Sequence, residues 1–153
     1  MSNVARKLFR NRLGQALVEF ALVVPIFMLL VMGVIEFGRA WNLQQTMTEA
    51  AREGARRAAV FDPTVTPTQA ATAIRTKIQA AGFDSTQTVI TWQDCTTACS
   101  TIGTFASLGR GDVVSVDVSM PYQFTFLKRL INLVNTNSNG SITLATSTRF
   151  RKE

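Results

Sequence analysis

The sequence predicts an α+β protein: a long N-terminal helix, one half transmembrane and the other half a spine, with a small, mainly antiparallel β-sheet packed on the outer half. Three observations predict this fold. An uncharged apolar run extends from Phe20 to Ile35. A helical pattern of small and apolar residues continues beyond it as far as Phe61. Segments with the alternation of half-buried strands then occupy much of the C-terminal half.

The apolar run is long enough to cross a membrane. Together with Ala16, Leu17 and Val18 it approaches the roughly 20 residues that span about 30 Å of hydrocarbon as a helix. A helix is expected there because the backbone must satisfy its own hydrogen bonds in lipid. One acid, Glu19, interrupts the beginning of the run. A carboxylate within a membrane span is unfavourable, so it indicates a function and calls for a partner.

The charges that flank the run predict its orientation. Four cations and no acid precede it, and such a positive flank stays in the cytoplasm. The expected organisation is therefore a basic cytoplasmic leader (1–14), a transmembrane helix (15–37) and an extracytoplasmic domain (38–153) with a helical spine (38–61). The four cations are Arg6, Lys7, Arg10 and Arg12.

A secretory signal peptide is the alternative interpretation of this N-terminus. Gly38-Arg39-Ala40 has the small-x-small pattern of a signal peptidase site. Against it, the apolar run is longer than the usual core of about 7–15 residues, and Glu19 would be out of place inside such a core. The alternative protein would be a single-pass or secreted binding domain, with a mature N-terminus at Trp41.

The spine follows from a stripe of small and apolar residues that recurs every three or four positions. Charged residues fall on the opposite side, where Glu49 with Arg52 and Glu53 with Arg56 or Arg57 form helix-favouring pairs. Many members of the stripe are Ala or Gly, so another layer of the fold can approach closely. Asp62-Pro63 is expected to end the helix. The stripe consists of Ala40, Leu43, Met47, Ala50, Gly54, Ala58 and Phe61.

A second helix and three strands complete the expected elements. Thr66-Pro67-Thr68-Gln69 is a capping box with proline at the first helical position, and Gly82 is the expected stop. Pro121 is expected to end the central strand, and 124–134 to form a short amphipathic helix before a polar loop at 135–140. The apolar face of the second helix is Ala70, Ala71, Ile74, Ile78 and Ala81; the strands are Thr88–Gln93, Val113–Met120 and Ser141–Phe150.

Composition excludes several classes of function. The chain has a net charge of +6 but no basic stripe with interleaved aromatics, so no nucleic-acid partner is expected. It has no histidine, no nucleophile elbow and no phosphate-binding glycine loop. We therefore expect no catalytic residue, no cofactor and no metal; a membrane-tethered enzyme would need a polar cleft that the spacing does not predict. Cys95 and Cys99, outside the membrane, are expected to form a disulfide that closes a small loop.

The segment Gly14-Gln15-Ala16-Leu17-Val18-Glu19-Phe20 resembles the processing site of type IV-like prepilins, and specifically that of the TadE-like pseudopilins of tight-adherence (Flp-type) pilus systems. The resemblance continues through 34–40 and 50–56, and a weaker likeness is found at Gly111-Asp112 and at the end of the chain, 148–153. No resemblance is identified for residues 62–108.

The resemblance implies a minor pilin or pseudopilin, without enzymatic activity, in the bacterial inner membrane or in a cell-surface filament. Its expected partners are the membrane, a prepilin peptidase, other pilins or pseudopilins and the pilus assembly platform. The peptidase would cut between Gly14 and Gln15. Glu19, then the fifth mature residue, and its neighbour Phe20 would serve assembly, with Glu19 paired to the N-terminal amine of an adjacent subunit. The plainer alternative places Glu19 at the headgroup level, where it interacts with the helix dipole.

Overall fold

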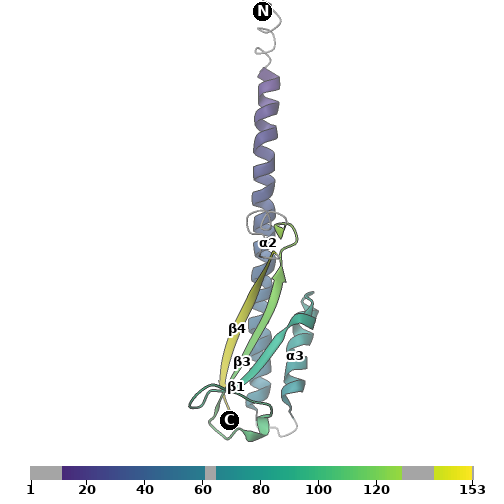
Figure 1. Ribbon diagram of the computed structural model, residues 1–153. Helices are drawn as coiled ribbons and strands as arrows, with labels where there is room; N and C mark the ends of the chain where they lie inside the picture. The colour runs from purple at the N-terminus through teal and green to yellow at the C-terminus, as the bar shows by residue number, and fades with distance from the viewer. Residues whose placement is uncertain (1–11, 61–64, 129–139, 153) are drawn as a thin grey trace, which may run out of the picture.

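A computed structural model of the 153-residue chain describes residues 12–60, 65–128 and 140–152. The helices are α2 (Arg12–Ala59) and α3 (Pro67–Ala80), and the strands are β1 (Val89–Asp94), β2 (Ser100–Thr101), β3 (Val113–Gln123) and β4 (Ser141–Arg151). Two 3-10 turns, η1 (Ser85–Gln87) and η2 (Phe105–Ser107), lie between them. Figure 1 shows the N-terminal half of α2 projecting alone, while the sheet and α3 lie along its other half. The α+β prediction is confirmed.

The long helix α2 is continuous over 48 residues, with Pro25 inside it. At 1.5 Å per residue it is about 70 Å long. Glu53 pairs with Arg57 at 3.0 Å, one of the predicted combinations. Glu49 instead contacts Lys77 of α3 at 3.5 Å. The described helix ends at Ala59; Phe61 and the predicted stop at Asp62-Pro63 lie outside the described residues.

The second helix, α3, begins and ends as its sequence predicts. Thr66 Oγ1 accepts a hydrogen bond from the Gln69 amide at 3.3 Å, and Gln69 Oε1 accepts one from the Thr66 amide at 3.0 Å. At the other end Gly82 has a φ of 85°, and its amide bonds to the Gln79 carbonyl at 2.9 Å. Glycine adopts this left-handed conformation without steric cost. On the predicted apolar face Ala70, Ile74 and Ile78 are buried, whereas Ala71 is half-buried and Ala81 exposed.

The sheet has four antiparallel strands in the order β2-β1-β3-β4. The three predicted strands are present, but β2 was not predicted. It pairs with β1 over only two positions, Gln93 with Thr101 and Asp94 with Ser100, and two residues cannot show an alternating pattern. Cys95 and Cys99 form a disulfide between these paired ends, so the bond closes the turn of the β1–β2 hairpin.

The prediction that Pro121 ends the central strand is wrong. Strand β3 continues through Pro121, which pairs with Thr143, to Gln123. The last pair between β1 and β3 is Val89 with Ser119, so from Met120 onward the described pairing of β3 is with β4 alone. A strand with one open edge tolerates proline because the missing N–H is not needed on the open side.

The core lies between the C-terminal half of α2, helix α3 and one face of the sheet. Small side chains bring the layers together: a Cβ built on Gly54 would lie 2.5 Å from Ile74 Cδ1. The predicted stripe is buried over its described length, from Ala40 to Ala58, and the buried surface of the helix also includes other alanines. The predicted helix 124–134 and loop 135–140 lie largely outside the described residues. The additional buried alanines are Ala51, Ala55 and Ala59.

Candidate functional site

The predicted processing and assembly residues all lie on the first turns of α2. Gly14, Gln15, Glu19 and Phe20 are exposed, with 68 % of Phe20 accessible. Among the side chains that the structure describes, no cation lies within ion-pair distance of the Glu19 carboxylate. Its predicted counter-charge would come from another chain, so the assigned roles of these four residues stay predictions.

Beyond Glu19 the protruding half of α2 is apolar and lacks contact with the outer domain over most of its length. Among the described helices, one, Gly14–Ala59, is long and apolar enough to cross a membrane. Exposed side chains of this kind need a non-aqueous environment, either lipid or other apolar helices. The large apolar side chains that are exposed on α2, counting the two that precede Glu19 and ending at Ile35, are Leu17, Val18, Phe20, Leu22, Val23, Ile26, Phe27, Met28, Leu29, Leu30, Val34 and Ile35.

A buried acid, Glu36, lies where α2 first meets the sheet. Its side chain is 0 % exposed and accepts three hydrogen bonds from the end of β3 and the loop that follows. The Tyr122 hydroxyl donates to Oε1 at 3.1 Å, and the Thr125 amide donates to the same oxygen at 2.7 Å. The Phe126 amide donates to Oε2 at 3.1 Å. The carboxylate therefore links the end of β3 and the loop that follows it to α2.

These donors explain why an acid can be buried at this position. A carboxylate without partners in a low-dielectric site is strongly disfavoured, whereas two amides and a hydroxyl stabilise its charged form. With both oxygens engaged, Glu36 is suited to holding structure rather than to proton transfer. We call this set of contacts (Glu36 with Tyr122, Thr125 and Phe126) the Glu36 clamp.

The contacts of the Glu36 clamp also change the pKa of Tyr122. Burial, followed by the hydrogen bond to Glu36 and the charge of that carboxylate, raises the pKa of Tyr122 above its ordinary value. The ring of Tyr122 also makes an edge-on contact with Phe124, and the two ring centroids lie 5.4 Å apart. Tyr122 is thus a neutral hydrogen-bond donor over the whole physiological range.

Sequence reasoning quoted Glu36 only as part of a resembling segment and gave it no role. A signal was nevertheless present, because Glu36 precedes Ala40, Leu43 and Met47 at helical spacing and so extends the buried stripe by one turn. An acid on the apolar side of an amphipathic helix requires donors from the facing layer. Which residues supply them could not be predicted, because Tyr122 lies 86 residues further along the chain.

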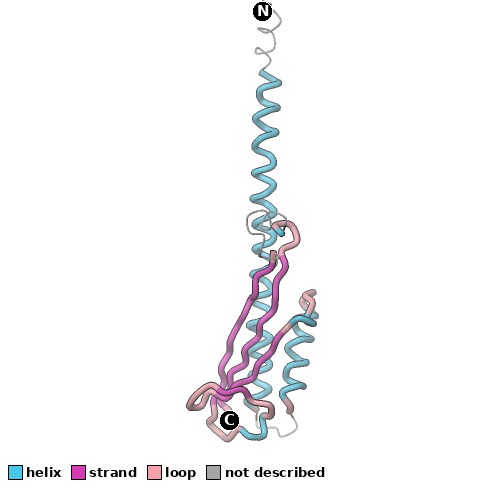
Figure 2. Tube along the Cα trace, viewed as in Figure 1, coloured by secondary structure: helices cyan, strands magenta, loops and turns pink. Residues whose placement is uncertain are grey.

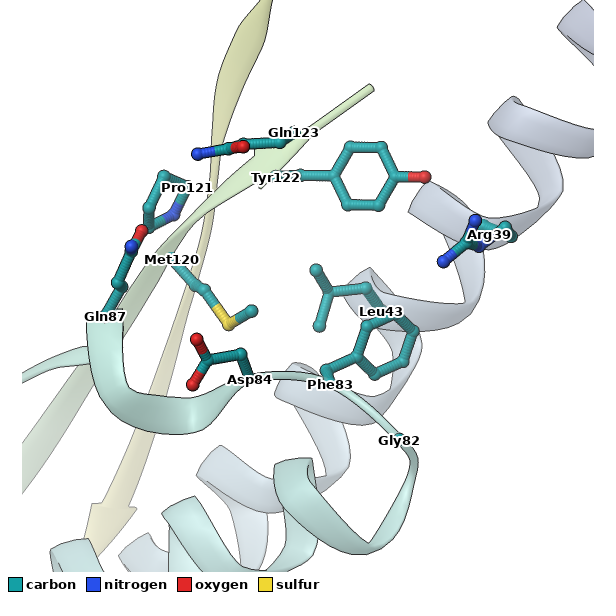
Figure 3. A pocket seen from close by; sticks show the side chains of 10 residues that line it. All are labelled: Arg39, Leu43, Gly82, Phe83, Asp84, Gln87, Met120, Pro121, Tyr122 and Gln123. Carbon is teal, nitrogen blue, oxygen red and sulfur yellow. The ribbon is translucent and has the colours of Figure 1, made fainter. Parts of the chain in front are cut away.

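A pocket of about 330 Å³ adjoins the clamp, between α2, the connection from α3 to η1 and the open edge of β3. Figure 3 shows Arg39 and Leu43 of the helix facing Phe83, Met120 and the Tyr122 ring. The one acid among its lining residues, Asp84, is engaged: its carboxylate accepts the Thr86 amide at 2.9 Å. The hydrogen bonds from Thr86 lower the pKa of Asp84.

Metal-binding and catalytic arrangements were not predicted, and the described residues include no cluster of three or more potential metal ligands. The predicted disulfide between Cys95 and Cys99 is present, at the opposite end of the sheet from the Glu36 clamp. The absence of enzymatic activity stays a prediction.

Comparison with known proteins gives one match. Residues 14–56 match the model of a family described as TadE-like protein. The matched range begins at Gly14, covers the apolar run, Glu36 and most of the spine, and confirms the resemblance of the N-terminal third. A search of curated proteins and a search of solved structures gave no match.

Proposed function

We propose that this chain, whose residues 14–56 carry the TadE-like segment, is a minor pilin or pseudopilin of a tight-adherence pilus system. It is inserted in the bacterial inner membrane with its N-terminus in the cytoplasm and its outer domain outside. A prepilin peptidase cuts between Gly14 and Gln15. The mature chain then assembles with other pilins or pseudopilins on the pilus platform, as a structural or priming component without enzymatic activity.

One observation carries the proposal: a single helix contributes an exposed apolar surface at one end and the core of the outer domain at the other. Its first half exposes large apolar side chains, whereas Leu43, Met47 and Ala50 of its second half are fully buried. A plain anchor needs no such continuity. A subunit that packs by its helix and displays a domain outside does need it.

Glu19 supplies the specificity of assembly in this proposal. Its carboxylate is exposed on the apolar half of α2, and in lipid a carboxylate lacks the water that solvates it in solution. Cleavage after Gly14 creates an α-amine on Gln15. A carboxylate in a low-dielectric environment strongly favours a cation beside it, so the amine of a neighbouring subunit would set the register of packing.

The arrangement at Glu36 argues against the signal-peptide alternative. Cleavage before Trp41 would separate Glu36 and Arg39 from the outer domain. The Tyr122 hydroxyl and two backbone amides would then lose their acceptor. A removable signal is not expected to contribute a buried side chain to the mature fold.

Mass spectrometry of the chain extracted from membranes of a host with a prepilin peptidase tests the proposal. We expect a product beginning at Gln15, and we expect Gly14→Val to abolish cleavage while insertion continues. Glu19→Ala should still be inserted and cleaved but should no longer support pilus formation. Glu53→Ala, an exposed acid on the same helix, is the matched control and should leave pili normal. An intact N-terminus in piliated cells, or normal pili with Glu19→Ala, would contradict the proposal.

A further inference from the structure

The loop that follows β3 lies at the same level as the end of the apolar run. Glu36 comes one residue after Ile35, a rise of about 1.5 Å along the helix axis. Side chains of a helix tilt toward its N-terminus, so the Glu36 carboxylate reaches back toward the apolar half. Because the Phe126 amide is 3.1 Å from this carboxylate, the loop is held beside the point where the apolar run ends. Figure 2 shows this loop meeting the helix at the end of the sheet that faces the protruding half.

The side chains at this level suit a membrane surface. Phe126 is 50 % exposed although it belongs to the outer domain. On the helix, Phe37 and Trp41 are also exposed, and their rings stack with centroids 6.2 Å apart. They lie about 3 and 9 Å beyond Ile35 along the axis. Trp concentrates at this depth of a bilayer, where its amphipathic ring lies among the headgroups. Phe on the apolar side of an interfacial segment lies at the boundary between headgroups and acyl chains.

Two exposed cations accompany these rings. Arg39 lies between Phe37 and Trp41 along the helix axis, on the side that lines the pocket beside Tyr122, and Lys128 follows Phe126 on the loop. Both therefore lie at the headgroup depth, where basic residues are attracted to anionic lipid phosphates. The exposed apolar surface of α2 is continuous with this patch through Ile35 and Phe37.

We propose that the loop 124–128 rests on the outer surface of the bilayer, with the Phe126 ring inserted at the boundary between headgroups and acyl chains and the Glu36 clamp holding it there. The occupant of this patch is therefore lipid rather than a second protein. The inference rests on the proposed function in one respect, since it requires α2 to be inserted up to about Ile35. It adds a second, non-helical contact between the outer domain and the membrane.

Spin labels on single introduced cysteines test this inference in the full chain, because Cys95 and Cys99 are already paired. The chain is reconstituted in phosphatidylcholine vesicles, with and without phosphatidylglycerol, and collision with oxygen and with a neutral nickel chelate is measured by EPR. Ile26→Cys reports insertion of the helix. Phe126→Cys reports the loop. Val60→Cys, on a residue 54 % exposed immediately after the far end of α2, is the matched water-exposed control for Phe126, which is 50 % exposed.

We expect the label at 126 to collide more with oxygen and less with nickel than the label at 60, and less with oxygen than the label at 26. Phosphatidylglycerol in the vesicles should increase the depth at which the label at 126 lies in the bilayer. Glu36→Gln should shift the label at 126 toward the values at 60, while the spectrum at 60 stays unchanged as evidence of folding.

Equal accessibility at 126 and 60 with a lipid-exposed label at 26 would overturn the inference alone. A water-exposed label at 26 would overturn both the inference and the proposed insertion. A label at 126 insensitive to Glu36→Gln would overturn the role of the clamp.

Discussion

The Tyr122 hydroxyl donates a hydrogen bond to the Glu36 carboxylate at 3.1 Å, and so joins the end of the central strand to the first buried turn of the long helix. Two backbone amides complete the coordination of the same carboxylate. The contact lies where the protruding half of the chain becomes the outer domain. Its loss should therefore affect both the stability of the domain and its attachment to the helix.

Replacement of the buried acid should be far more damaging than replacement of an exposed one on the same helix. Glu36→Ala leaves two part-buried amides without their acceptor. The Tyr122 hydroxyl keeps only its longer contact of 3.4 Å with the Glu36 carbonyl. Groups that lose their partner away from water cost about 1–3 kcal/mol each. Glu53→Ala removes an exposed pair with Arg57, worth about 0–1 kcal/mol. Chemical unfolding followed by near-ultraviolet circular dichroism would compare the two variants in the same detergent. Equal losses would show that the clamp contributes no more than a surface ion pair.

The tyrosine of the clamp should make the outer domain sensitive to alkaline pH. Its pKa is raised in the folded chain, so folding favours the protonated hydroxyl. The stabilisation is fully present below the ordinary tyrosine pKa of 10.0 and is lost as the pH rises through the higher folded value. Unfolding measured between neutral pH and about pH 11 should show a steeper alkaline loss in the native chain than in Tyr122→Phe. Parallel pH curves for the two proteins would contradict this prediction.

Gly54 should resist substitution more than another glycine of the same helix. A Cβ at position 54 would lie 2.5 and 2.7 Å from Cδ1 and Cγ1 of Ile74, whereas a Cβ at Gly38 meets no atom within 4 Å. Overpacking costs about 1–3 kcal/mol, against a gain of about 0.5–1 kcal/mol from replacing a helical glycine by alanine. We expect Gly54→Ala to lower the thermal midpoint of unfolding and Gly38→Ala to raise it or leave it unchanged.

A second substitution separates steric conflict from other effects at this position. Ile74→Val removes Cδ1, the atom nearest to the added methyl group. The double variant Gly54→Ala/Ile74→Val should lose less stability than the sum of the two single variants, because neighbouring residues couple. Strict additivity would show that the close approach of Gly54 to Ile74 is not the cause.

Reduction of the Cys95–Cys99 disulfide should have a moderate and local effect. The bond closes the turn between β1 and β2, and for so short a loop the chain-entropy contribution is about 2 kcal/mol. Hydrogen exchange with and without reductant should show faster exchange in the β1–β2 hairpin and unchanged protection in β3 and β4. The double variant Cys95→Ser/Cys99→Ser provides the control that reductant cannot affect. Global unfolding on reduction would contradict the prediction.

Local patterns in the sequence predicted most of the elements. The stripe from Ala40 to Ala58 predicted the buried face of the spine because helical burial repeats with a short period. The capping box at Thr66 and the stop at Gly82 predicted α3 because both signals act within a few residues. Strand β2 and the extension of β3 through Pro121 could not be predicted, because both depend on which strand lies alongside.

The site was only partly predictable for the same reason. Glu19 and Gly14 were identified from a short motif, and their roles depend on other chains. Glu36 was not recognised, because its donors come from residues more than eighty positions later in the chain. The role of a buried acid can be predicted only when the residues that cover it are known, and tertiary packing determines which residues these are.

The continuity of α2 has a mechanical consequence. The helix is continuous from its apolar half to the half that carries the sheet, and Glu36 links the two parts to the loop after β3 at their junction. Rotation of the apolar half of α2 about the helix axis would therefore rotate the sheet through the same angle. If neighbouring subunits in an assembly fixed the rotation of this helix, they would also determine which side of the outer domain each subunit presents to the exterior.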